Sequence, residues 1–154
     1  MLTSIAILVG LILLSGLFSA SETAFTSLSM LQVQHLVENK GKKGRLVKEL
    51  SGKPDILLTT ILIGNNLANI GASAIATKLT IDLFGSQAIG IMTGILTLII
   101  LIFAEVTPKR IAIIHNEGIT QLVAPFVKLL SLIFGPFNWL ISLISSFITR
   151  FFAS

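Results

Sequence analysis

The sequence predicts an all-α integral membrane domain with three transmembrane helices, juxtamembrane helices and a C-terminal re-entrant or belt-like helical segment. Of the 154 residues, 53% are hydrophobic and 12% are charged, whereas a soluble domain carries about 25% charged residues. Such a chain cannot cover itself with polar surface, so lipid is its expected solvent. No polar linker divides the apolar stretches, and a single domain over residues 1–154 is therefore expected.

Composition also limits the chemistry. The chain has no cysteine, which excludes disulfides and thiolate metal sites. Its 11 Lys and Arg outnumber its 7 Asp and Glu, and most of the excess lies between the first two spans. A basic loop in that place sets membrane topology, so no nucleic-acid partner is expected. The sequence has no HExxH, GxSxG or paired catalytic aspartates, and no enzymatic activity is expected.

The first span is predicted from residues 2–20, which carry no charge. At 1.5 Å per residue this stretch nearly matches a bilayer core of about 30 Å. Phe18-Ser19-Ala20 resembles the cleavage site of a signal peptide. No Lys or Arg precedes the apolar run, however, as a signal peptide requires, so a true first span is the favoured interpretation.

The stretch between the first two spans is predicted to form a helical hairpin on the membrane surface. Leu31 to Leu50 alternate apolar and polar residues, and Asn39-Lys40-Gly41 marks a turn. Basic loops stay in the cytoplasm, so residues 35–53 are placed there and the N-terminus outside. The anionic inner leaflet attracts lysines, which makes membrane lipid an expected partner; a solvated cytoplasmic loop is the plain alternative, and both can hold.

The second and third spans follow as two apolar stretches. The second begins at Pro54, because Pro in the first turn and the nearby Asp55 are helix-start signals, and it runs to about residue 80. The third covers about residues 87–106. It is expected to break at Pro108, which removes a hydrogen bond to the carbonyl of Ala104.

A GxxxG pattern in the third span, from Gly90 to Gly94, predicts a face on which two helices approach closely. That contact lies within one subunit or between two. Lys109 and Arg110 follow the span at once and indicate its cytoplasmic end.

The remaining apolar stretch, residues 119–148, is interrupted by Pro125 and Lys128 and again by Gly135-Pro136. Each uninterrupted part is too short to cross a bilayer comfortably. A re-entrant or interfacial segment is therefore favoured over a fourth span.

Polar residues at three places in the apolar stretches point to a shared site. Asn65 and Asn69 stand at i and i+4 on one face of the second span, next to Gly64, which permits close approach of another helix or access to its carbonyl. Glu105 closes the third span. Ser19 and Ser21 close the first span at the same side. Polar and ionisable groups inside a membrane are functional candidates.

The types of ligand limit which cations such a site could bind. Carboxylate, amide, hydroxyl and carbonyl oxygens suit Mg²⁺, Ca²⁺, Mn²⁺ or Na⁺ and do not suit Zn²⁺ or copper. Structural interpretations remain open beside this one: the asparagines can act as hydrogen-bonding glue between helices, and the serines can bond their own backbone. Glu105 has Lys109 at i+4 as a salt-bridge partner.

Three motifs in order closely resemble the CorC/CorB and cyclin M (CNNM) family of magnesium transporters: Ser19-Ala20-Ser21-Glu22, Gly64-Asn65-Asn66 and Glu105-Val106-Thr107-Pro108-Lys109. The resemblance covers the whole chain as the family's transmembrane domain. It implies a homodimer with three spans per subunit and a helical belt. It also implies Mg²⁺ export coupled to Na⁺ entry across the plasma (inner) membrane.

The metal ligands that the resemblance implies are Ser19, Ser21, Gly64, Asn65, Asn69 and Glu105, with Na⁺ as a second candidate ion. Which serine ligates directly stays open. Family members continue into ATP-binding CBS domains, and we expect these in the full-length protein, because this chain stops at Ser154. The alternative function is a Mg²⁺-sensing membrane domain that regulates attached cytoplasmic domains without carrying flux.

Overall fold

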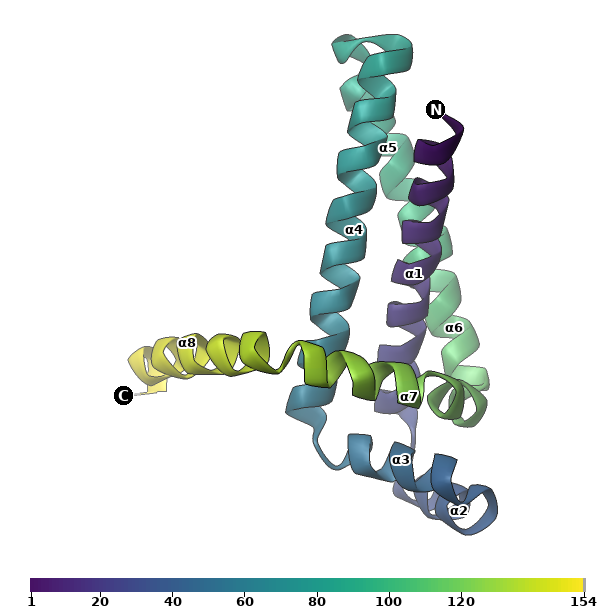
Figure 1. Cartoon of the computed structure of the whole chain (residues 1–154), viewed down its shortest axis with the longest axis vertical. Helices are drawn as coiled ribbons and strands as arrows, with labels where there is room; N and C mark the ends of the chain where they lie inside the picture. Colours follow the sequence, from purple (N-terminus) through teal and green to yellow (C-terminus); the bar gives the residue numbers. More distant parts are fainter. Residues whose placement is uncertain (154) are drawn as a thin grey trace.

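The computed structural model describes residues 1–153, which are almost entirely helical and contain no strand (Figure 1). The helices follow one another along the chain with short connections. In order they are α1 (Leu2–Ser27), α2 (Met30–Lys40), α3 (Lys42–Ser51), α4 (Pro54–Phe84), the 3₁₀ turn η1 (Ser86–Ala88), α5 (Ile89–Ile100), the π-helical turn η2 (Leu101–Val106), α6 (Thr107–Ile114), α7 (Asn116–Ile133) and α8 (Gly135–Ala153).

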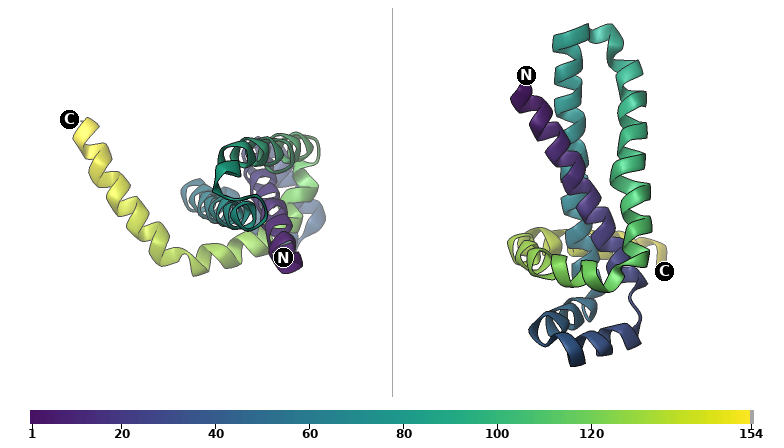
Figure 2. Two further views of the ribbon diagram at one scale, coloured as in Figure 1. Left: turned by 90° about the horizontal axis from the view of Figure 1, so that it is seen from above. Right: turned by 90° about the vertical axis from the view of Figure 1, so that its right-hand side faces the viewer.

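Three helices are long and apolar enough to cross a membrane: α1, α4 and the continuous helix over Ser86–Ile114. They stand side by side as a bundle, with α4 and α5 joined at the end where the N-terminus also lies (Figure 2). The predicted all-α membrane fold with three spans is confirmed. The predicted start of the second span at Pro54 is also correct.

The prediction that Pro108 breaks the third helix was wrong. Helix α6 continues through Pro108 to Ile114, because the six residues before it form a π-helical turn. In this turn the N–H of Thr107 bonds the carbonyl of Ile102, five residues back. The wider turn accommodates the missing N–H and the ring of the proline without a kink.

Helices α2 and α3 form the predicted hairpin at the other end of the bundle (Figure 1). The side chains of Ser29 and Gln32 cap the start of α2 reciprocally. The turn falls at Gly41, whose φ of 58° suits glycine. Gly44 lets the two helices touch, since a Cβ at this position would overlap the carbonyl of Leu36.

The C-terminal segment forms two helices that bend by 70° at their junction and run across the direction of the spans (Figure 1). Helix α7 contains Pro125 and packs against α1 and α3, whereas α8 extends away from the bundle (Figure 2). A polar link joins α8 to the spans: the buried Asn138 donates its Nδ2 to Thr60 Oγ1 at 3.2 Å. A straight fourth span is excluded, as the interruptions predicted.

The hydrophobic core lies at the hairpin end of the bundle, which we call the basic end. Five helices (α1, α2, α3, α4 and α7) contribute to one cluster of buried side chains there: Phe18, Phe25, Leu36, Val47, Leu50, Leu57, Ile61, Val123, Ala124 and Val127. This cluster fixes α1 against α4 immediately below the polar residues of both spans.

Candidate cation site

Asn65 and Asn69 face α1 and meet a serine that the sequence had not singled out. Ser15 Oγ lies 2.7 Å from Asn65 Oδ1 and 2.6 Å from Asn69 Oδ1. Ser15 is fully buried, and Asn65 is 9% exposed. Three side-chain oxygens from two spans therefore form one group, which we call the oxygen cluster: Ser15 Oγ, Asn65 Oδ1 and Asn69 Oδ1.

The oxygen cluster has fewer protons than short contacts. A hydroxyl donates one hydrogen at a time, and both amides present Oδ1 to the hydroxyl of Ser15. One of the two oxygen–oxygen contacts therefore carries no proton. Asn65 lies about 16 Å along α4 from Pro54, near the middle of a bilayer. An oxygen-rich group at this depth suits a cation.

Ser19 and Ser21 have different environments although both are buried. Ser21 Oγ donates to the Leu17 carbonyl of its own helix at 2.7 Å. Ser19 Oγ is closed off from solvent and has no hydrogen-bond partner among residues 1–153. Ser19 also stands four residues after Ser15, on the same face of α1 and one turn nearer the basic end. Its hydroxyl is therefore free to bind something else.

Gly64 lies next to Asn65 and is packed against the ring of Phe18. A Cβ on Gly64 would overlap this ring. Phe18 is 3% exposed, and its ring centroid lies 5.9 Å from that of Phe126 of α7, with the rings tilted by 35°, so the ring has little room to move. The glycine thus permits a close approach, which was one of its two expected roles.

Glu105 lies in the π-helical turn, on the part of the third span that packs against α1. Gly16 makes this approach close, because a Cβ there would lie 3.1 Å from the Phe103 carbonyl oxygen and 3.4 Å from Pro108. The carboxylate itself pairs with Lys109 at 3.4 Å and is 25% exposed. The π-helical turn thus meets α1 at Gly16, but the Glu105 side chain forms the expected i,i+4 salt bridge and no hydrogen bond to the oxygen cluster.

The structure therefore brings together part of the predicted site. Asn65 and Asn69 share one group, Gly64 and the unpartnered Ser19 are adjacent to it along their helices, and Ser21 and Glu105 are engaged elsewhere. Within residues 1–153 no three His, Cys, Asp or Glu side chains form a cluster that could hold a metal. Any cation here must rely mainly on neutral oxygens.

Two residues of this region were missed by sequence reasoning, Ser15 and Gly16. The signal for Ser15 was its spacing of four residues before Ser19, which places two hydroxyls on one face of an otherwise apolar helix. Gly16 gave no such signal. Its role depends on the neighbouring π-helical turn, and a π turn is not encoded by hydropathy.

The fold and the oxygen cluster define a multi-pass membrane protein domain with a polar group buried between its spans. Comparison with known proteins gives its family. The model of the cyclin M transmembrane N-terminal domain matches residues 6–154, and the chain belongs to this family of membrane transporter or regulator domains. The predicted resemblance to the CorC/CorB and cyclin M family is confirmed.

Bacterial and plant relatives support the same assignment. The chain is 40% identical over 141 residues to a UPF0053 protein of Haemophilus influenzae, covering 92% of this chain and 34% of that protein. It is 36% identical over 137 residues to the UPF0053 inner membrane protein YfjD of Escherichia coli (89% and 32%). It is 35% identical over 141 residues to a chloroplastic DUF21 domain-containing protein of Arabidopsis thaliana (92% and 21%). The chain thus spans about a third of the two bacterial relatives and about a fifth of the plant relative.

Proposed function

We propose that this domain binds Mg²⁺ inside the membrane and moves it out of the cytoplasm, driven by Na⁺ entry. The observation that carries the proposal is the oxygen cluster, buried between two spans with one proton for two short contacts. Hard oxygen ligands are those that Mg²⁺ prefers. The direction and the coupling to Na⁺ rest on the resemblance of the three motifs to CorC/CorB and cyclin M transporters.

Each proposed ligand would have a distinct role. Asn65 and Asn69 supply amide oxygens, and Gly64 supplies its backbone carbonyl. Of the two serines, Ser19 is the better candidate, because its hydroxyl is unpartnered whereas Ser21 would have to release the carbonyl of Leu17. We add Ser15, since its hydroxyl already contacts both amide oxygens.

Glu105 would supply the charge of the site. To reach the ion it must exchange Lys109 for Mg²⁺, so binding would break an existing salt bridge. One carboxylate leaves a divalent ion with a net positive charge in a medium where charge is costly. Binding is therefore expected to be weak and reversible, as transport requires.

The proposed orientation puts the N-terminus outside and the basic hairpin in the cytoplasm of a bacterium, with the domain in the inner membrane. Between Met30 and Lys53 the hairpin region carries six basic and two acidic residues, and such segments remain on the cytoplasmic side. The relative of E. coli is named an inner membrane protein. Cysteine substitutions at the exposed Lys42 or Lys43 and at the exposed Ser86, labelled from each side of intact cells, test this orientation.

The proposed assembly is a homodimer. Helix α5 has no buried residue, and nothing lies within 4 Å of a Cβ built on Gly90 or Gly94. The GxxxG face is thus unused within the subunit and available for a second copy. In the full-length protein, ATP-binding CBS domains would follow this domain.

A flux measurement tests transport against the rival function. Purified protein in liposomes that contain a Mg²⁺ dye is given an outward or an inward Na⁺ gradient. Transport predicts a change in Mg²⁺ that reverses with the Na⁺ gradient and vanishes without protein. A sensor that regulates attached domains predicts Mg²⁺ binding without flux, and that result would overturn the transporter proposal.

A binding measurement tests the site itself. Mg²⁺ that binds the folded state raises the melting temperature in proportion to the logarithm of its concentration over Kd. Asn69→Ala and Glu105→Gln are each expected to abolish this rise. Asn66→Ala is the matched control, because this side chain is exposed on the same helix. If all three variants respond to Mg²⁺ like the parent, the proposed site is wrong.

A further inference from the structure

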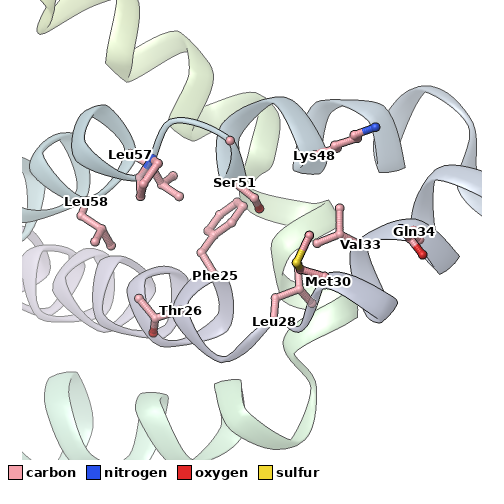
Figure 3. Close-up of a pocket in the computed structure, with 12 residues that line it drawn as sticks. Phe25, Thr26, Leu28, Met30, Val33, Gln34, Lys48, Ser51, Leu57 and Leu58 are labelled. Atoms are coloured by element: carbon pink, nitrogen blue, oxygen red, sulfur yellow. The ribbon is translucent and has the colours of Figure 1, made fainter.

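A cavity at the basic end lies away from the oxygen cluster and has no role in the proposed transport. It has a volume of about 480 Å³, within the range of small-molecule sites. It opens between the end of α1, the start of α2, the end of α3 and the first turns of α4 (Figure 3). We call it the interfacial cavity, because it lies where the apolar spans end and the basic hairpin begins.

One side of the interfacial cavity is apolar. Phe25 and Leu57 form its floor as part of the buried core, and they are 6% and 3% exposed. Leu58 of α4 and Met30 of α2 continue the wall outward, and Met30 is 82% exposed. Figure 3 shows Leu57 and Leu58 on the α4 side of the opening, Phe25 on the α1 side and Met30 beside Val33 on the α2 side. Such a wall suits hydrocarbon and offers little to a polar ligand.

The other side carries polar groups that have no partner. Lys48 and Ser51 stand at i and i+3 on α3 and both line the cavity. Ser51 Oγ is closed off from solvent and forms no hydrogen bond with the part of the chain that the structure describes. The ion pairs within residues 1–153 join Lys109 to Glu105 and Lys128 to Glu49, so the Lys48 ammonium has no acidic partner there.

We propose that the interfacial cavity binds one anionic phospholipid, with its phosphate at Lys48 and Ser51 and the first part of an acyl chain against Met30, Leu57 and Leu58. Charge complementarity selects this occupant. The hairpin region has six basic and two acidic residues, and the inner leaflet carries anionic lipids. The proposal rests on the orientation given above, which brings the cavity to that leaflet, and not on Mg²⁺ binding.

The test compares lipids one at a time on the purified chain in detergent with EDTA present. Native mass spectrometry measures the bound fraction of phosphatidylglycerol and of phosphatidylcholine with the same acyl chains. We expect phosphatidylglycerol to bind the parent at least fivefold more tightly. Lys48→Gln with Ser51→Ala should remove most of this preference, since one cation near a lipid surface is worth roughly a factor of five.

Two further variants keep the proposal falsifiable. Lys43→Gln removes the same charge from the exposed face of the same helix, outside the cavity, and should change the preference less than twofold. Met30→Gln alters the exposed apolar wall and should weaken both lipids together. Circular dichroism spectra of the variants check that each one folds.

Several outcomes would overturn the proposal. Equal losses in Lys43→Gln and in the double variant would mean diffuse attraction to the whole hairpin. Equal binding of the two lipids to the parent would mean that the cavity binds acyl chains without selecting the headgroup. If neither lipid binds, the cavity is not a lipid site, and a protein segment becomes the better candidate for its occupant. Competition by free glycerol phosphate as strong as by the whole lipid would mean a soluble phosphate site. Because Mg²⁺ is absent throughout, none of these results depends on the transport proposal.

Discussion

The basic end of the bundle and the opposite end are built differently. At the basic end, five helices share one core of large side chains, and the hairpin and α7 close around α1 and α4. At the opposite end α1, α4 and α5 stand without any further helix (Figure 2), and α5 buries no residue. The contrast indicates that the core at the basic end holds the oxygen cluster in place, whereas lipid or a second subunit must cover the apolar surface of the opposite end.

Helix α4 shows the same contrast within one element. Its buried residues near the basic end include Leu57 and Ile61, whereas Ala72 and Ala76 are buried further along. Large residues build a core, and small residues allow backbones to come close without one. Asn65 and Asn69 lie where the first kind of packing gives way to the second.

The largest effect is expected where two backbones touch at the basic end. In Gly44→Ala the new methyl group would overlap the Leu36 carbonyl and the next backbone nitrogen. Neither can move without opening the hairpin, so we expect a loss of about 3 kcal/mol or more in unfolding free energy. Thermal unfolding measures it, with Gly118→Ala on α7 as the control, since nothing lies within 4 Å of that Cβ. A melting temperature equal to that of the control would contradict this account of the hairpin.

A second prediction compares the two ends on one helix. Gly64→Ala drives a methyl group into the buried ring of Phe18 and should cost about 1–3 kcal/mol. Gly71→Ala meets only the flexible end of Leu11 at 3.2 Å and should cost less than 1 kcal/mol, because that side chain can move. Denaturation of both variants in the same detergent gives the comparison. Equal losses would mean that the core does not constrain Phe18.

Buried hydroxyls provide a third comparison. Thr60 accepts a hydrogen bond from the buried Asn138 amide, whereas the Thr80 hydroxyl donates to the carbonyl of Ala76 in its own helix. Thr60→Val should cost about 1–3 kcal/mol because it leaves a buried donor unsatisfied, and Thr80→Val should be nearly neutral. Limited proteolysis of α8 adds a local readout, and only Thr60→Val should accelerate it. Faster cleavage in Thr80→Val would break the comparison.

The smallest effect is expected at the surface of the basic end. Lys128 Nζ of α7 pairs with Glu49 of α3 at 3.1 Å, and both side chains are more than 40% exposed. Glu49→Gln should lower the stability by less than about 1 kcal/mol, and the difference should disappear in high salt. Melting curves at two salt concentrations measure it. A loss that persists in high salt would indicate a structural role beyond charge.

Much of the fold was predictable because a bilayer simplifies the problem. Apolar run length identified the spans, and Gly41 with the Pro54 start signal located the hairpin turn and α4. The continuation of the third helix through Pro108 could not be predicted in the same way. A proline in the sequence indicates a lost backbone hydrogen bond, but a π-helical turn can accommodate that loss without ending the helix. The residue pattern does not predict such a turn.

The candidate site was predictable only in its residue types. Spacing placed Asn65 and Asn69 on one face, and they do share one partner. That partner is Ser15, because the depth at which α1 crosses α4 depends on the core around Phe18 and Gly64. The difference between Ser19 and Ser21 likewise depends on which hydroxyl bonds its own backbone, and the Ser19-Ala20-Ser21-Glu22 motif does not indicate this.

The π-helical turn has a consequence for the rotational phase of the third span. It adds one residue to a helical turn, so every side chain that follows is rotated by about 100° from the position an uninterrupted α-helix would give it. The faces of α5 and α6 therefore belong to two separate helical wheels, one holding Gly90 and Gly94 and the other Lys109 and the buried Ala112. Deleting one apolar residue from 101–106 would remove this extra rotation and turn the face of α6 that packs on α1 toward lipid, with almost no change in hydropathy.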